Sequence, residues 1–268
     1  MSQGMKLAVP FSKGPVVAVI RLQGVIASGS PARLNDMGLA QLIEKAFRKG
    51  KPKAVALLLN SPGGSPVQSS LIASRIRRLS QEKNIPVVAF VEDVAASGGY
   101  WLATAADEIY ADANSIVGSI GVISAGFGFN KFISRYGVER RVYTAGESKS
   151  MLDPFQPEQE DDVARLKELQ GQIHDAFKAQ VRQRRGDRLS DDPRLFTGEF
   201  WVGERAREMG LIDGIGHMVP VMKDRFGDKT RFAIYKQKKP FLSRFGASLA
   251  EQAMGGVEDR AAYARFGL

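Results

Sequence analysis

The first half of the chain alternates continuous apolar runs with segments in which apolar residues recur at helical spacing. The continuous runs predict buried strands at 15–22, 54–59, 85–91, 107–111 and 116–123. The intervening segments predict helices at 36–48, 67–78 and 101–106. Strands that alternate with helices in this way indicate a parallel sheet with right-handed crossovers.

The pattern changes after Pro157. Apolar residues then recur three or four positions apart, as expected for a long amphipathic helix: Val163, Leu166, Leu169, Ile173, Phe177 and Val181. Shorter elements flank this helix: a helix at 130–136 and a strand at 140–143 before it, and the apolar segment 200–202 and a helix at 204–209 after it. His217 lies in a glycine-rich turn that opens a further helix. A moderate apolar stripe in the tail predicts a surface helix that docks on the body, another subunit or a membrane. The stripe consists of Phe241, Leu242, Phe245, Leu249 and Met254.

Two glycine-rich turns, at 60–66 and 95–99, follow predicted parallel strands. The carboxyl ends of such strands meet at one crevice, where sites in open α/β sheets lie. Ser97 follows one of these strands and precedes Gly98 and a helix, where backbone N–H groups are available to a developing negative charge. It is therefore either a nucleophile or the N-cap of the helix.

Composition narrows the chemistry. The chain has 268 residues, enough for one large α/β domain, with 44% hydrophobic and 25% charged residues. It has no cysteine, which excludes disulfides, thiolate metal sites and cysteine nucleophiles. The two histidines, His174 in the long helix and His217 in a late turn, lack neighbours that suggest a catalytic base. No cofactor is indicated.

The net charge of +9 and the pI of about 9.7 fit either a basic globular protein or one attracted to an anionic surface. We find no nucleic-acid-binding motif, so we expect no nucleic-acid partner. The polar N-terminal stretch lacks the apolar core of a signal peptide, and no apolar run approaches the ~18 residues of a membrane span. We expect a cytoplasmic protein, and the basic tail with Lys236, Lys238 and Lys239 is the candidate for peripheral contact with a membrane.

A serine nucleophile without a histidine needs another base, and a lysine serves if burial lowers its pKa. Lys149 lies among small and apolar residues and is a candidate for this base. The alternative is that Lys149, like most lysines in loops, is exposed to solvent and has no catalytic role. The backbone amides of Gly63, Gly64 and Gly98 are candidates for an oxyanion site opposite the nucleophile.

Four motifs occur in order: Asn-Ser-Pro-Gly-Gly-Ser at 60–65, Ala-Ser-Gly-Gly-Tyr at 96–100, Gly-Ser-Ile-Gly at 118–121 and Gly-Glu-Ser-Lys at 146–149. Together with Phe-Thr-Gly at 196–198 they resemble the signal peptide peptidase A family, the S49 serine peptidases. The resemblance covers roughly residues 15–225. It implies a crotonase- or Clp-protease-like α/β fold, a spiral of ββα units, to which the long helix and a helical C-terminal appendage are added.

The resemblance also implies roles for individual residues. Ser97 matches the nucleophile, Lys149 the general base, and Ser119 the serine that orients the lysine. The turn at Gly63 and Gly64 matches the oxyanion loop. Family members cleave peptides, including remnant signal peptides, and assemble into homo-oligomeric rings or domes with sites near subunit interfaces. Many carry an N-terminal membrane anchor, of which this chain shows none.

We expect a flexible N-terminus at 1–14, a single peptidase domain at 15–235 and a basic, partly helical tail at 236–268. Three alternatives stay open. A crotonase-like acyl-CoA enzyme would share the fold but use oxyanion amides without a serine nucleophile. A Clp-type triad expects a histidine soon after the serine, and none lies between Ser97 and His174. A non-catalytic scaffold would share only the fold.

Overall fold

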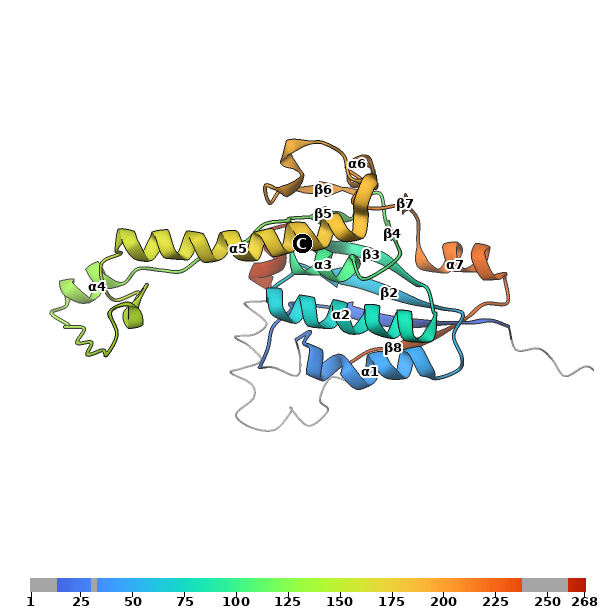
Figure 1. The fold of residues 1–268 in the computed structure, drawn as a ribbon, viewed down its shortest axis with the longest axis horizontal. Helices are drawn as coiled ribbons and strands as arrows, with labels where there is room; N and C mark the ends of the chain where they lie inside the picture. The colour runs from blue at the N-terminus through green and yellow to red at the C-terminus, as the bar shows by residue number, and fades with distance from the viewer. Residues whose placement is uncertain (1–13, 30–32, 238–259) are drawn as a thin grey trace, which may run out of the picture.

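The computed structural model describes residues 14–29, 33–237 and 260–268. In these residues an eight-stranded, mostly parallel sheet forms the centre of the molecule, in the order β6-β5-β3-β2-β1-β8, with β4 beside β3 and β7 beside β4 (Figure 1). The strands are β1 Val16–Gln23, β2 Ala54–Ser61, β3 Val87–Ala96, β4 Glu108–Ala111, β5 Ile116–Gly118, β6 Phe200–Val202, β7 Gly214–Ile215 and β8 Arg231–Tyr235. Only the pairing of β5 with β6 is antiparallel.

Helices cover both faces of the sheet, which explains why its central strands are apolar throughout. Alternate residues of β1 point to opposite faces: Ile20 joins the large cluster under the helices α1 Asp36–Arg48, α2 Pro66–Lys83 and α3 Gly98–Ala103, whereas Val19 packs in the cluster that contains Met222 of α7 Met218–Phe226. The other labelled helices are α4 Asn130–Arg135, α5 Glu160–Arg185 and α6 Gly203–Glu208, with short 3-10 turns η1 Glu147–Ser150, η2 Gly186–Arg188 and η3 Pro193–Phe196, and residues 260–264 are helical as well.

The long helix α5 belongs to the body only at its C-terminal end. There Phe177 stacks on Trp101 of α3 with ring centroids 4.9 Å apart, and Val181 is fully buried. The N-terminal part extends away from the sheet and carries α4 and η1 at its tip (Figure 1). We call residues 122–159, together with this free part of α5, the arm.

The α/β fold class expected from the sequence is confirmed, with a mostly parallel sheet and helices on both faces, but several elements differ from the prediction. The strand predicted at 140–143 is wrong: this segment has no neighbouring strand to pair with, and Arg140 instead forms an ion pair with Asp153. β5 ends at Gly118, earlier than predicted, because Ser119 turns the chain with a positive φ of 54°. β3 continues past the charged residues Glu92 and Asp93 to Ala96, so residues 93–96 are strand rather than turn.

The end of the chain packs on the body beside the carboxyl end of β3. Phe266 contacts Phe200 edge to face, with ring centroids 5.2 Å apart, and is buried with Val94 and Ala96. The Tyr263 hydroxyl donates a hydrogen bond of 2.8 Å to the Asn60 carbonyl. The apolar stripe predicted at 241–254 lies outside the described residues.

Candidate active site

Ser97 stands at the junction of β3 and α3 with a positive φ of 53° and a ψ of −123°. A serine rarely adopts this conformation, which costs of order 1–3 kcal/mol and persists only where the surroundings impose it. Here the Ser97 N–H donates to the Gly118 carbonyl at 2.8 Å, and the Ser97 carbonyl accepts from Trp101 N–H at 3.0 Å. The residue is half-buried between buried neighbours, and none of the described residues hydrogen-bonds to its hydroxyl. The sharp turn therefore presents a free Oγ at the carboxyl end of the sheet.

The turn of Gly63 and Gly64, which follows β2, lies directly against Ser97. A Cβ added to Gly63 would lie 2.8 Å from Ser97 Cβ and 2.7 Å from the Ala96 carbonyl oxygen. Both glycines have positive φ values, 103° and 138°. A side chain at Gly63 is thus excluded by space and by backbone conformation together. The two glycine-rich turns predicted to meet at one crevice are adjacent in the structure.

The three candidate oxyanion amides are not equivalent. The Gly63 N–H already donates to Ser61 Oγ at 3.2 Å. The Gly64 N–H and the Gly98 N–H have no hydrogen-bond partner among the described residues, and Gly98 is the first residue of α3. A Cβ added to Gly98 would lie 3.3 Å from Gly64 N, so these two donors border one small space. Two free N–H groups beside a serine can stabilise an anionic oxygen.

Ser119 occupies the equivalent position on the neighbouring strand. It is the first residue after β5, as Ser97 is the first after β3, and the residues before them, Gly118 and Ala96, are paired in the sheet. Ser119 also has a positive φ, 54°, and its N–H donates to the Glu199 carbonyl at 2.7 Å. The structure therefore brings Ser97, Ser119 and the glycine turn together.

Lys149 is not part of this group within one chain. It is exposed and lies in η1, at the tip of the arm (Figure 1). The Asp162 carboxylate accepts from Leu152 N–H at 3.0 Å and so holds this loop to the first turn of α5. The helix then returns to the body at His174, whose Nε2 lies 3.0 Å from the Ile120 carbonyl oxygen. From Asp162 to His174 the helix advances roughly 18 Å at about 1.5 Å per residue, and this length separates Lys149 from the Ser119 region.

Neither histidine lies in position to activate Ser97. The ring of His174 bonds to the main chain at Ile120, and that of His217 lies 2.8 Å from Asp112 Oδ2. The pKa of Asp112 is lowered to about 2, first by the backbone N–H of Asn114 and then by the hydrogen bond with His217. These contacts are structural, as the sequence pattern indicated for His174.

Sequence reasoning missed the polar residues that hold the glycine turn. Ser61 Oγ donates to the Gly24 carbonyl at 2.7 Å while it accepts from Gly63 N–H. The buried Ser69 hydroxyl donates to the Ser65 carbonyl at 2.8 Å and occupies the space that a side chain at Gly98 would need. It also missed the covering of β3 by Tyr263 and Phe266. Their spacing of three residues is helical, but nothing in the pattern says which surface they meet.

Among the described residues, no group of three or more His, Asp or Glu side chains could hold a metal ion. Nor, in the same ranges, does any helix have the length and apolar character needed to cross a bilayer.

The fold defines the class of protein. The solved structure of the 1510-N membrane-bound stomatin-specific protease superposes with a TM-score of 0.53 at 16% identity, and the match covers 84% of this chain and 99% of that chain. A second structure of that protease, in complex with a substrate peptide, gives the same TM-score at 15% identity, covering 92% of this chain and 99% of that chain. At this identity the likeness shows the ClpP- and crotonase-like fold.

Sequence comparison shows the family. The model of peptidase family S49 matches residues 80–225, more than half of the chain. The chain belongs to peptidase family S49, as the ordered motifs predicted, and thus to a family of serine peptidases.

Two similar proteins are much longer than the matched region. Protease 4 of Haemophilus influenzae is 33% identical over 212 residues, which cover 75% of this chain and 32% of that protein. A Brucella melitensis protein named Na(+)/H(+) antiporter NhaA is 45% identical over 271 residues, which cover 94% of this chain and 37% of that protein. The chain thus spans about a third of the length of these relatives, and the antiporter's name describes a larger protein.

Proposed function

We propose that this protein is a serine endopeptidase in which Ser97 and Lys149 form a catalytic dyad completed between subunits. The observation that carries the proposal is the convergence of Ser97, Ser119 and the glycine turn at adjacent strand ends. Membership of peptidase family S49 supports the reaction class.

In the proposed mechanism, Lys149 Nζ accepts the proton of Ser97 Oγ, which attacks the carbonyl carbon of the scissile peptide bond. The N–H groups of Gly64 and Gly98 stabilise the oxyanion, and Gly63 allows the close approach of the two turns. Lys149 then donates its proton to the leaving amine, and later activates the water that releases the acyl group. Ser119 orients the lysine.

The lysine comes from a neighbouring copy of the chain. In its own chain Lys149 is exposed and is held away from Ser97 by the free part of α5. A lysine acts as a base near neutral pH only when it is removed from water, so a second subunit must bury it. The arm offers the surface for this contact, because Phe127, Phe132, Tyr136 and Tyr143 are between 61% and 90% exposed on it. Contiguous exposed aromatic residues mark interaction sites.

We propose unfolded or apolar peptides, such as remnant signal peptides, as the substrate class. A similar protein of Enterococcus faecium, 28% identical over 75% of this chain, is named a putative signal peptide peptidase SppA. A crotonase-like acyl-CoA enzyme of the same fold is the alternative. Labelling of Ser97 by a serine-directed reagent supports the peptidase, whereas tight acyl-CoA binding without labelling supports the alternative.

The dyad is tested by subunit mixing. Ser97→Ala and Lys149→Ala should each abolish hydrolysis of a fluorogenic apolar peptide, while Lys167→Ala, a matched exposed lysine on α5, keeps full activity. When the two inactive variants are denatured, mixed in equal amounts and refolded together, about one quarter of the sites pair an intact Ser97 with an intact Lys149 from another subunit. Recovery of about that fraction of activity supports the proposal. Activity in either single variant, or none in the mixture when wild type refolds to full activity, would contradict it.

A further inference from the structure

A dense group of cations lies at the end of the sheet opposite to Ser97. We call it the basic face; it comprises Lys45, Arg48, Lys49, Lys51, Lys53 and Lys83, all of them exposed. Five of these lie within the nine residues 45–53, a segment without an acidic residue. Lys83 comes from the end of α2, next to the start of β3. Since β3 has 10 residues, this face lies roughly 30 Å from Ser97 at about 3.3 Å per residue.

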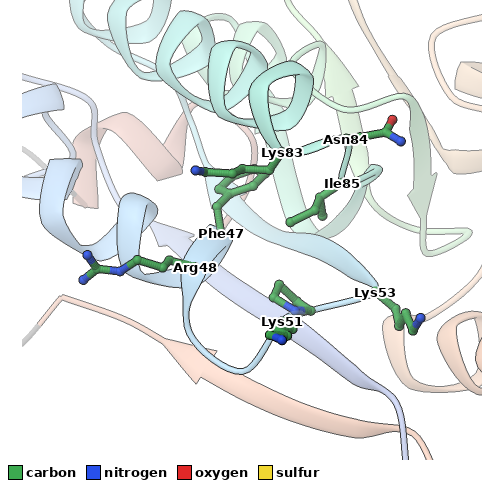
Figure 2. A pocket seen from close by; sticks show the side chains of 8 residues that line it. Phe47, Arg48, Lys51, Lys53, Lys83, Asn84 and Ile85 are labelled. Atoms are coloured by element: carbon green, nitrogen blue, oxygen red, sulfur yellow. The ribbon is translucent and has the colours of Figure 1, made fainter.

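Four of the cations surround a cavity of about 460 Å³ (Figure 2). Arg48, Lys51, Lys53 and Lys83 line it together with Asn84, and Phe47, Pro52 and Ile85 also line it. Phe47 and Pro52 are buried and contribute apolar surface to the cavity lining, whereas the four cations are exposed. The basic face is therefore concave and combines exposed cationic side chains with buried apolar residues.

None of the six cations has an ion pair among the described residues. Elsewhere in the described structure, acids and arginines pair closely, as Arg75 does with Asp36 at 2.7 Å and Arg225 with Glu108 at 2.7 Å. The acids nearest in sequence to the basic face are engaged with other residues. Glu44 pairs with Arg75 and Glu82 with Arg78. Six uncompensated positive charges thus share one surface.

Stabilisation of the fold does not account for this arrangement. Arg48 and Lys83 stand at the C-terminal ends of α1 and α2, where cations favour the helix dipole. Lys51 and Lys53 lie in the connection between α1 and β2 and have no such benefit. Lys51 moreover adopts a positive φ of 45°, a conformation in which glycine or asparagine is usual. The like charges of the basic face repel each other. An anionic partner would compensate this repulsion.

We propose that the basic face docks this protein on an anionic phospholipid surface through the phosphate groups of the lipids. A single phosphate ligand would call for a buried, preformed cradle, but all six cations are exposed. A surface with many anionic headgroups suits them better, because each Lys or Arg near such a surface adds a similar increment to binding. Single-stranded nucleic acid would need aromatic platforms, and the one aromatic residue that lines the cavity, Phe47, is 2% exposed. Docking through this face leaves the strand ends at Ser97 unobstructed.

The test is co-sedimentation of the full chain with vesicles of phosphatidylcholine alone or with 30% phosphatidylglycerol. The test variant is Lys51→Gln with Lys53→Gln and Lys83→Gln. Its matched control, Lys131→Gln with Lys167→Gln and Lys223→Gln, removes the same charge from lysines elsewhere that also have no ion pair among the described residues. We expect binding of the wild type to the anionic vesicles only, loss of that binding at 0.5 M NaCl, and affinity lower by about one to two orders of magnitude in the test variant but not in the control.

Three results would overturn the proposal. Equal loss in both variants would mean that net charge alone drives the attraction, and unchanged binding of the test variant would assign it to another surface, such as the basic tail. If anionic vesicles do not bind, but inorganic phosphate or a DNA oligonucleotide binds the wild type and not the test variant, the partner is not a lipid. Peptidase activity of the test variant, measured without vesicles, should equal that of the wild type. This control separates a failure of membrane docking from a failure of the proposed catalytic dyad.

Discussion

The surroundings of Ser97 and the arm differ in how much of their surface is buried by contacts within the chain itself. Around Ser97 the glycine turn, α3 and the strand ends pack so closely that no side chain fits at Gly63. On the arm, Phe132 and Tyr136 contact each other, with ring centroids 5.0 Å apart, but are 61% and 67% exposed. The same helix, α5, spans both regions. The region around Ser97 is therefore packed within one chain, whereas the arm exposes aromatic side chains that the same chain does not cover.

The junction between the two regions should be the most sensitive point for stability. Phe177 is 3% exposed and anchors α5 on Trp101. Phe177→Ala should lower the free energy of unfolding by about 3–5 kcal/mol, since it removes an aromatic side chain from a packed core. Urea denaturation measures the loss. Ile173→Ala, four residues earlier and 38% exposed, is the control and should cost less than about 1 kcal/mol. Equal losses would show that α5 is not anchored where the two regions join.

Disturbing the tight packing beside Ser97 should lower the peptidase activity. Gly63→Ala places a Cβ 2.7 Å from the Ala96 carbonyl oxygen and strains a φ of +103°. The displaced turn should lower kcat/KM at least about 100-fold, equivalent to ~2.7 kcal/mol of transition-state stabilisation. Gly171→Ala, a control within α5 where nothing lies within 4 Å of the added Cβ, should leave the peptidase rate unchanged. A fully active Gly63→Ala enzyme would remove the glycine turn from the proposed mechanism.

A buried ion pair fixes the end of α5 to the body. Arg185 donates to Asp213 at 2.7 Å, and their side chains are 2% and 19% exposed. Burial alone would raise the pKa of Asp213, but the hydrogen bond and charge of Arg185 outweigh burial and lower it. Asp213→Asn leaves Arg185 without its counter-charge and should cost about 3 kcal/mol at pH 7.

The loss of stability in Asp213→Asn should depend on pH in a definite direction. Because the pKa of Asp213 is lowered in the folded state, its contribution to stability is fully present above the unfolded pKa of about 3.9 and is lost as the pH falls from there through the lower folded-state pKa. The stability gap between wild type and Asp213→Asn should therefore narrow in acid, as urea titrations at pH 7 and pH 3 would measure. Glu204→Gln, in an exposed pair with Arg207, should change stability by less than about 0.5 kcal/mol. A gap that does not depend on pH would contradict the assignment.

The arm should show the smallest effect on stability and a clear effect on assembly. Phe132→Ser with Tyr136→Ser should change the free energy of unfolding by about 0.5 kcal/mol or less, because both side chains are exposed in the isolated chain. Light scattering should show a shift toward monomers, and peptidase activity should fall with it. Met37→Ser with Val219→Ser, exposed residues of the body, should leave both unchanged. An intact oligomer in the arm variant would mean that this surface does not join subunits.

The sequence predicted best where one local rule decides the structure. The periodicity of Leu39, Ile43 and Phe47 predicted α1 at its observed bounds. The sequence also predicted Ser97 at the end of a strand, because an apolar run followed by a serine and two glycines is typical of a turn from a strand into a helix. β8 was missed, and 140–143 was wrongly predicted as a strand. Whether an apolar segment becomes a strand depends on a partner: β8 finds the edge of β1, and residues 140–143 find none.

By itself the sequence determined the fold class, the family and the residues whose chemistry suits peptide cleavage, because these depend on residue types in order along the chain. Only the tertiary structure decided which of those residues meet. It brings Ser97, Ser119, Gly64 and Gly98 together through strand pairing and excluded volume. It leaves Lys149 at the end of a rigid helix, because the length of α5 and its anchor at Phe177 set that distance. It also brings Lys83, at the end of α2, beside the cations of residues 45–53, which its place in the sequence does not reveal.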